Sequence, residues 1–128
     1  MTVNKDRVEL LCQALESERY VQCRRKLRME VLSIGSRVKF TYCALGVAID
    51  VAVKNGLQIG PIRLEEWYHD HGSLPWEVQM WYGFGYSNPD IWVDEYETAI
   101  ASANDDGADF WTISQAIRAR YLKDFDDA

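Results

Sequence analysis

Two histidines flank an aspartate at His69-Asp70-His71, and this pattern comes nearest to a metal site in the chain. Zinc needs three or four ligands at a fixed geometry. The nearest cysteine, Cys43, is distant in the sequence, and no two cysteines show CxxC spacing. Two histidines in one loop give at most a partial site, so the sequence predicts no metal and no other cofactor.

Cys43 is the second candidate for chemistry. It begins an apolar segment that reads as a helix, and a helix N-terminus favours the thiolate form of a cysteine. A cysteine nucleophile also needs a base, yet both histidines of the chain lie in one loop. Cys43 is therefore interpreted as a small packed hydrophobic residue.

Paired carboxylates occur at Glu65-Glu66 and Asp105-Asp106. Hydrolytic chemistry would need two such groups in one cleft with their pKa values pushed apart, whereas a solvated surface explains acidic pairs without any chemistry. We expect that the protein is not an enzyme. A metal- or carboxylate-dependent enzyme with its site near His69 and His71 stays as an alternative.

Aromatic side chains are crowded between residues 67 and 92. A domain of this size cannot bury them all, and we expect the core to take Trp81 and Trp92. Exposed Trp and Tyr are typical of protein interfaces, although packing in the core and at its boundary is the alternative explanation. With three aspartates added, the predicted partner-binding residues are Trp67, Tyr68, Trp76, Tyr82, Tyr86, Asp105, Asp106 and Asp109.

The net charge of −6 hides a split along the chain. Residues 1–42 hold nine basic and five acidic side chains, whereas residues 90–128 hold three basic and ten acidic ones. The acidic balance argues against coating nucleic acid by bulk charge. A nucleic-acid-binding regulator using the Arg24–Arg28 cluster or the helix pair 96–122 stays as an alternative, but the acids around Asp109 would repel phosphate.

The elements that would position these residues follow from periodicity and end signals. Apolar residues predict a central buried helix over 43–54, with a strand as the alternative, and Gly46 inside it predicts close approach of another backbone. Further helices are expected after the caps Asn4 and Asp109. The other expectations are a short helix or turn over 20–27, a strand or extended coil over 38–42, a loop over 57–73, a helix from about 75 to Gly83, a strand over 91–93 and a helix over 96–103.

The fold class predicted from these elements is mainly α. We expect one compact helical domain over 1–123, with five or six short helices and room for one small β-hairpin, followed by a frayed acidic tail over 124–128. No apolar run is long enough for a membrane span, and the first residues lack the pattern of a secretion signal. An odd number of cysteines fits a reducing cytoplasm.

Three stretches of the chain carry a resemblance to a known family. They read CxLGVxxDxA from Cys43, LPxEVxxWxG from Leu74 followed by Asn88-Pro89, and NDxGxxFxxI from Asn104. In this order they resemble a family of small uncharacterised proteins encoded by tailed bacteriophages and prophages. Members carry a double cysteine where this chain has Cys43-Ala44, and this difference favours a structural role for Cys43. The resemblance implies an accessory protein inside a bacterial cell and carries over no catalytic residue.

These observations together predict a phage-encoded accessory protein that binds a host protein without catalysis and inhibits a host defence or another host process. An acidic face could mimic nucleic acid and occupy the basic groove of such a partner. A homodimer closed through Trp67, Tyr68 and Trp76 is compatible with the same residues.

Overall fold

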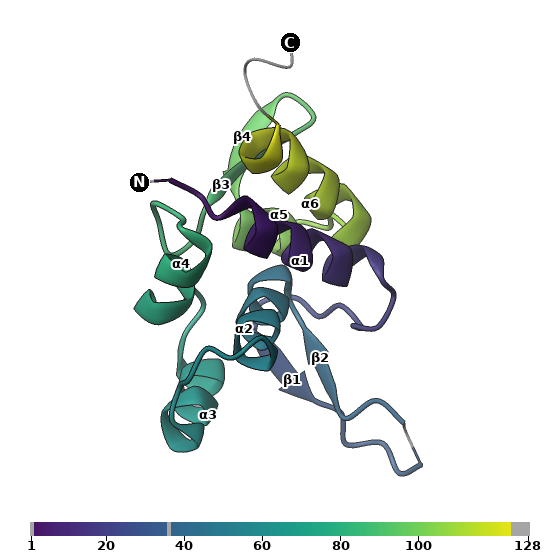
Figure 1. Ribbon diagram of the computed structural model, residues 1–128. Coiled ribbons are helices and arrows are strands. Elements are labelled where there is room, and N and C mark those ends of the chain that lie inside the picture. Colours follow the sequence, from purple (N-terminus) through teal and green to yellow (C-terminus); the bar gives the residue numbers. More distant parts are fainter. Residues whose placement is uncertain (1, 36, 124–128) are drawn as a thin grey trace.

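The computed structural model describes residues 2–35 and 37–123 and shows an α-rich fold with two small two-stranded sheets (Figure 1). The prediction of a mainly α fold is confirmed at this level. The predicted acidic tail over 124–128 lies outside the described residues. The elements in chain order are α1 (Lys5–Glu16), β1 (Arg28–Glu30), β2 (Phe40–Tyr42), α2 (Ala44–Lys54), α3 (Pro61–Asp70), α4 (Trp76–Tyr82), β3 (Asp90–Val93), β4 (Tyr96–Ala99), α5 (Ile100–Asp105), α6 (Phe110–Ile117) and the π-helical turn η1 (Arg118–Leu122).

Helix α2 forms the centre of the core, as the apolar pattern predicts, and the strand alternative is wrong. Cys43 caps the helix, because its Sγ accepts the N–H of Gly46. A Cβ added to Gly46 would overlap the main-chain oxygen of Leu27 and lie 2.9 Å from its carbonyl carbon. The predicted close approach of another backbone is therefore confirmed, and the partner is the segment that leads into β1.

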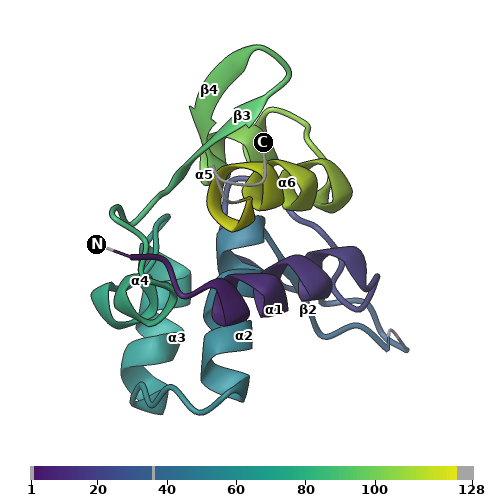
Figure 2. The same ribbon diagram turned by 45° about the horizontal axis from the view of Figure 1, so that its top comes forward.

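Helices α1 and α6 cover one side of the core. Asn4 caps α1 by accepting the N–H of Arg7, and Asp109 caps α6 by accepting the N–H of Thr112. Both caps are as predicted. The buried face of α1 consists of Val8, Leu11, Cys12 and Leu15. Figures 1 and 2 show α6 lying alongside α1, at the two ends of the sequence.

A charged cluster joins α1 to the C-terminal helices. The Glu16 carboxylate accepts from the Arg118 guanidinium, with 2.8 Å to Nε, and from the Ser114 hydroxyl. Arg118 also pairs with Glu9. The hydrogen bond from Arg118, followed by the one from Ser114, holds the pKa of Glu16 below its usual value, against the effect of burial.

This depressed pKa predicts a pH dependence of stability. The pair stabilises the fold above the unfolded pKa of Glu16, and its contribution is lost as pH falls through the lower folded pKa. We expect the free energy of unfolding of wild type to fall between pH 6 and pH 3 by about 1 kcal/mol more than that of Glu16→Gln. Urea unfolding at both pH values measures this difference. The exposed control Glu66→Gln keeps the wild-type dependence, and an equal dependence in Glu16→Gln would contradict the expectation.

Two expectations between residues 20 and 73 differ from the structure, the first of them in part. Residues 20–27 form no helix, because residues 21–23 instead run parallel to β2 and pair with Tyr42, and Arg25 takes a φ of 72°. The turn alternative for this segment stands. The expected loop over 57–73 contains α3, which begins where Pro61 follows Gly60, and proline is well suited to the first position of a helix.

The β-structure is also larger than predicted. The expected strand over 38–42 exists as β2, but its partner β1 was not predicted. The expected helix over 96–103 is wrong in its first half, because Tyr96–Ala99 form β4 and pair with β3, with Ile91 opposite Thr98. The Tyr and Thr residues of β4 favour a strand. The structure has two antiparallel strand pairs, β1–β2 and β3–β4, where one hairpin was expected. Within residues 2–35 and 37–123, no helix is long and apolar enough to span a bilayer.

Candidate partner-binding surface

Helices α3 and α4 carry the densest part of the aromatic run. One ion pair joins the two helices, and two contacts of Trp67 hold the segment that connects them. Arg63 forms a bidentate ion pair with Glu77, with 3.0 Å between Nη2 and Oε1. The Trp67 indole donates to the Ser73 carbonyl at 2.7 Å and stacks on the His71 ring with 3.6 Å between centroids. These contacts fix the connection between the two helices, which the sequence had indicated as a loop.

The end of α4 turns the chain back toward the start of the same helix. Gly83 takes a φ of 80°, which suits glycine, and the Phe84 N–H donates to the Gln79 carbonyl. The Leu74 N–H then donates to the Ser87 carbonyl at 2.8 Å. Residues 86–87 therefore lie beside the first turn of α4, where Trp76 is located.

The predicted aromatic residues divide between surface and core. Trp76 is 67% exposed and Tyr86 is 70% exposed. Tyr82 is fully buried and donates to the Ala48 carbonyl at 2.6 Å, and Tyr68 is also buried. The expectation that Tyr68 and Tyr82 face a partner is wrong, because both side chains fill the core.

Among the other tryptophans, Trp92 differs most from expectation, and Trp81 and Trp67 differ in part. Trp92, which was expected in the core, is exposed on β3, and Trp81 is half-buried against α1. Trp67 is half-buried too, because its indole contacts the main chain at Ser73. Trp111, on α6, is 60% exposed.

We define the α3–α4 surface by its exposed apolar side chains, which are Ile62, Trp76, Met80 and Tyr86. Met80 follows Trp76 by four residues and so shares its helix face. Ile62 is next to Arg63, whose ion pair with Glu77 brings the first turns of α3 and α4 together. Met80 was not predicted, although its spacing of four residues from Trp76 indicates the same helix face. Ile62 was not predicted because α3 itself was not predicted.

The three predicted aspartates do not join this surface. Asp105 accepts the main-chain N–H of Arg25 at 2.6 Å, and Asp109 caps α6, where the N–H of Thr112 lowers the pKa of its carboxyl. Asp106 ends α5 and is exposed. In Figures 1 and 2 the turn between α5 and α6 lies on the side of the molecule away from α4. Two of the three aspartates thus have structural roles.

The candidate chemical groups are scattered. His69 contacts the neighbouring Asp70 through Nδ1 at 2.6 Å, while His71 stacks on Trp67. In the part of the chain that the structure describes, no three His, Cys, Asp or Glu side chains gather as metal ligands.

All three cysteines are buried and unpaired as free thiols. Burial raises the pKa of Cys12 and of Cys43 to about 11. Both thiols are therefore protonated at neutral pH, and the sulfur of Cys43 serves as the cap of α2. This position agrees with the structural interpretation of Cys43.

No protein-family model, curated protein or solved structure matches the chain. The resemblance to phage-encoded proteins therefore stays a prediction. What the surface can do has to be argued from its own side chains.

Proposed function

We propose that the protein is a non-enzymatic binding protein that docks on another protein through the α3–α4 surface. The observation that carries this proposal is the exposure of Trp76 on a helix whose other face, with Val78 and Tyr82, is in the core. The indole is held outward by a helix that cannot rotate without exposing those core residues. Met80 and Tyr86 extend the apolar area around it.

Large aromatic side chains supply much of the binding energy of protein interfaces, because they bury a wide area with few rotatable bonds. Trp76 has the size and position of such an anchor. The ion pair of Arg63 and Glu77 borders it and supplies the polar rim that interfaces commonly have.

The partner that we propose is a host protein in the cytoplasm of a bacterial cell, with inhibition of a host process as the outcome. This part of the proposal depends on the resemblance to phage-encoded proteins. Mimicry of nucleic acid by an acidic face is not part of it, because Asp105 and Asp109 bond to the main chain of their own protein.

The alternative of a nucleic-acid-binding regulator loses part of its basis. In the Arg24–Arg28 cluster, Arg28 pairs with Glu65 and lies over the Tyr68 ring at 4.2 Å, so its charge is engaged within the fold. The helix pair predicted over 96–122 does not exist in that form, because its first four residues are β4.

Affinity capture from bacterial lysate with matched tryptophan variants tests the proposal. Trp76 and Trp111 are similarly exposed but lie on different elements. We expect Trp76→Ala to weaken capture of the partner by about tenfold or more, as for a central interface residue, and Trp111→Ala to leave it unchanged. Equal capture by wild type and Trp76→Ala would refute docking through this surface. Size-exclusion chromatography of purified wild type and both variants shows separately whether the chain pairs with a second copy of itself through Trp76.

A further inference from the structure

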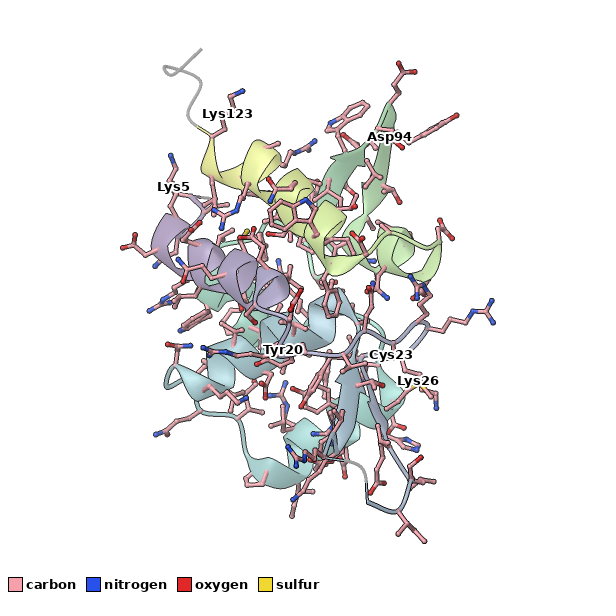
Figure 3. The ribbon with its side chains drawn as sticks, turned by 90° about the vertical axis from the view of Figure 1, so that its right-hand side faces the viewer. Lys5, Tyr20, Cys23, Lys26, Asp94 and Lys123 are labelled. Atoms are coloured by element: carbon pink, nitrogen blue, oxygen red, sulfur yellow. The ribbon has the colours of Figure 1, made fainter. Side chains whose placement is uncertain are left out.

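A second surface lies on the opposite side of the molecule, away from α4. An open groove of about 720 Å³ runs between the C-terminal half of α1, the end of α2 and β2. Figure 3 looks onto this face, with Tyr20 near its centre below the end of α1. The basic residues that line the groove are Arg19, Arg37, Lys39 and Lys54.

The groove is positively charged in a protein whose net charge is −6. No carboxylate is among the described residues that line it. Lys54 pairs with Asp50 at 2.8 Å, and Asp50 also accepts the Tyr20 hydroxyl, so the charge of Lys54 is partly balanced. Within residues 2–35 and 37–123, Arg19, Arg37 and Lys39 form no ion pair with a carboxylate, and they remain available to an anionic ligand.

The wall formed by β2 has an open main-chain edge. In an antiparallel pair, the main-chain groups of alternate residues face the partner strand and the side away from it. The main-chain oxygen of Lys39 and the N–H of Cys43 bond to the β1 side, at Val31 and Leu27. Tyr42 faces the other way, where it bonds to residues 21 and 23.

Phe40 precedes Tyr42 by two residues, so its N–H and C=O also face away from β1, on the groove side. No described residue bonds to these two groups, because the segment 21–23 reaches only as far as Tyr42. An open strand edge is a template for pairing with another extended chain.

We propose that this groove binds an extended acidic peptide segment of a partner protein. The peptide main chain pairs with β2 at Phe40, and its carboxylates reach Arg19, Arg37 and Lys39. The strand edge supplies main-chain hydrogen bonds, and the basic side chains select the charge of the peptide. The groove is separate from the α3–α4 surface, so this binding goes beyond the function proposed above.

A single-stranded nucleic acid fits the groove less well. Such ligands stack their bases on open aromatic faces. Arg28 already lies over the Phe40 ring at 4.0 Å, and the Tyr20 ring packs edge-to-face with Tyr42 at 5.2 Å. A phosphate backbone also cannot continue the β-ladder at Phe40, whereas a peptide can.

Fluorescence anisotropy with three labelled probes tests this inference. The first is a peptide of about ten residues that alternates Asp and Val, the second is the same peptide with alternate amides N-methylated, and the third is an oligothymidine. We expect wild type to bind the first probe, and N-methylation to weaken binding by about tenfold because the ladder bonds are lost.

Charge-reversal variants locate the binding. We expect the double variant Arg19→Glu/Lys39→Glu to weaken binding of the acidic peptide by about tenfold or more. The control Arg24→Glu/Lys26→Glu makes the same charge change on exposed residues outside the groove and stays within about twofold of wild type. If the first double variant does not fold by circular dichroism, Lys39→Gln against Lys26→Gln makes the same comparison.

Each other outcome overturns the inference. Absence of binding at low salt removes the groove as a site, and equal losses in both double variants indicate unspecific charge attraction. Equal affinity for the N-methylated and unmodified peptides would show that no main-chain pairing occurs at Phe40. A higher affinity for oligothymidine than for the acidic peptide would assign the groove to nucleic acid. As a control, we expect Trp76→Ala to leave the affinity for the acidic peptide unchanged. The test of the groove is then independent of the α3–α4 surface.

Discussion

Replacing Gly46 with alanine is expected to destabilise the protein by about 3 kcal/mol, the upper end of the cost of overpacking a core. In an exposed helix the same change stabilises by nearly 1 kcal/mol, because alanine is the better helix former. Here the added methyl group meets the main chain of Leu27, which cannot move aside as a side chain could. The Cys43 N–H donates to that same Leu27 carbonyl, so a shift would also break the entry into α2.

Thermal unfolding followed by circular dichroism measures the effect. A loss of this size lowers the melting temperature by about 10 °C in a domain of this length. Gly72→Ala is the matched control, because no atom lies within 4 Å of a Cβ added there. A variant of Gly46 as stable as wild type would mean that α2 and the Leu27 segment do not touch as described.

Replacing Asn104 with leucine is expected to cost about 3 kcal/mol, because it leaves buried polar groups without partners. The side chain is fully buried and connects three segments. Its Oδ1 accepts the N–H of Ala44 at 3.1 Å and the Gln22 amide, and its Nδ2 donates to the Cys23 carbonyl at 2.8 Å. The Ala44 N–H belongs to the first turn of α2, where no helical partner exists.

The free energies of unfolding of Asn104→Leu and Asn104→Asp, measured in urea, separate the effect of side-chain shape from the effect of lost hydrogen bonds. The aspartate keeps the acceptor for Ala44 but loses the donor to Cys23, so both variants are destabilised. Asn55→Ala, which removes a bond from an exposed side chain to the Val51 carbonyl, is expected to cost at most about 1 kcal/mol. A neutral effect of both Asn104 variants would show that the three segments are held by apolar packing alone.

The parts of the fold that the sequence predicted are those determined by local signals. The apolar run of α2 specifies a buried helix whatever surrounds it, and the caps Asn4 and Asp109 mark helix starts through their own side chains. Gly46 could be interpreted because a glycine inside such a helix has a cost that only a close contact offsets.

The parts that were missed depend on distant residues. Strand β1 exists because β2 pairs with it, and β2 lies about ten residues further along the chain. Tyr82 is buried against α2, and Tyr68 is buried beside Tyr42 and Arg28, and no pattern near residue 68 or 82 reveals these partners. The basic groove draws its side chains from three separate segments, so no sequence window shows it.

The pairing of α1 with the C-terminal helices has a consequence for synthesis. Glu16 and Arg118 are 102 residues apart in the sequence. While a ribosome makes the chain, α1 therefore emerges long before the helix that covers its apolar face. Proteins dominated by such distant pairings fold slowly, and exposed apolar surface invites aggregation in the meantime. Chaperone dependence of the nascent chain should accordingly persist until about residue 118 has left the exit tunnel.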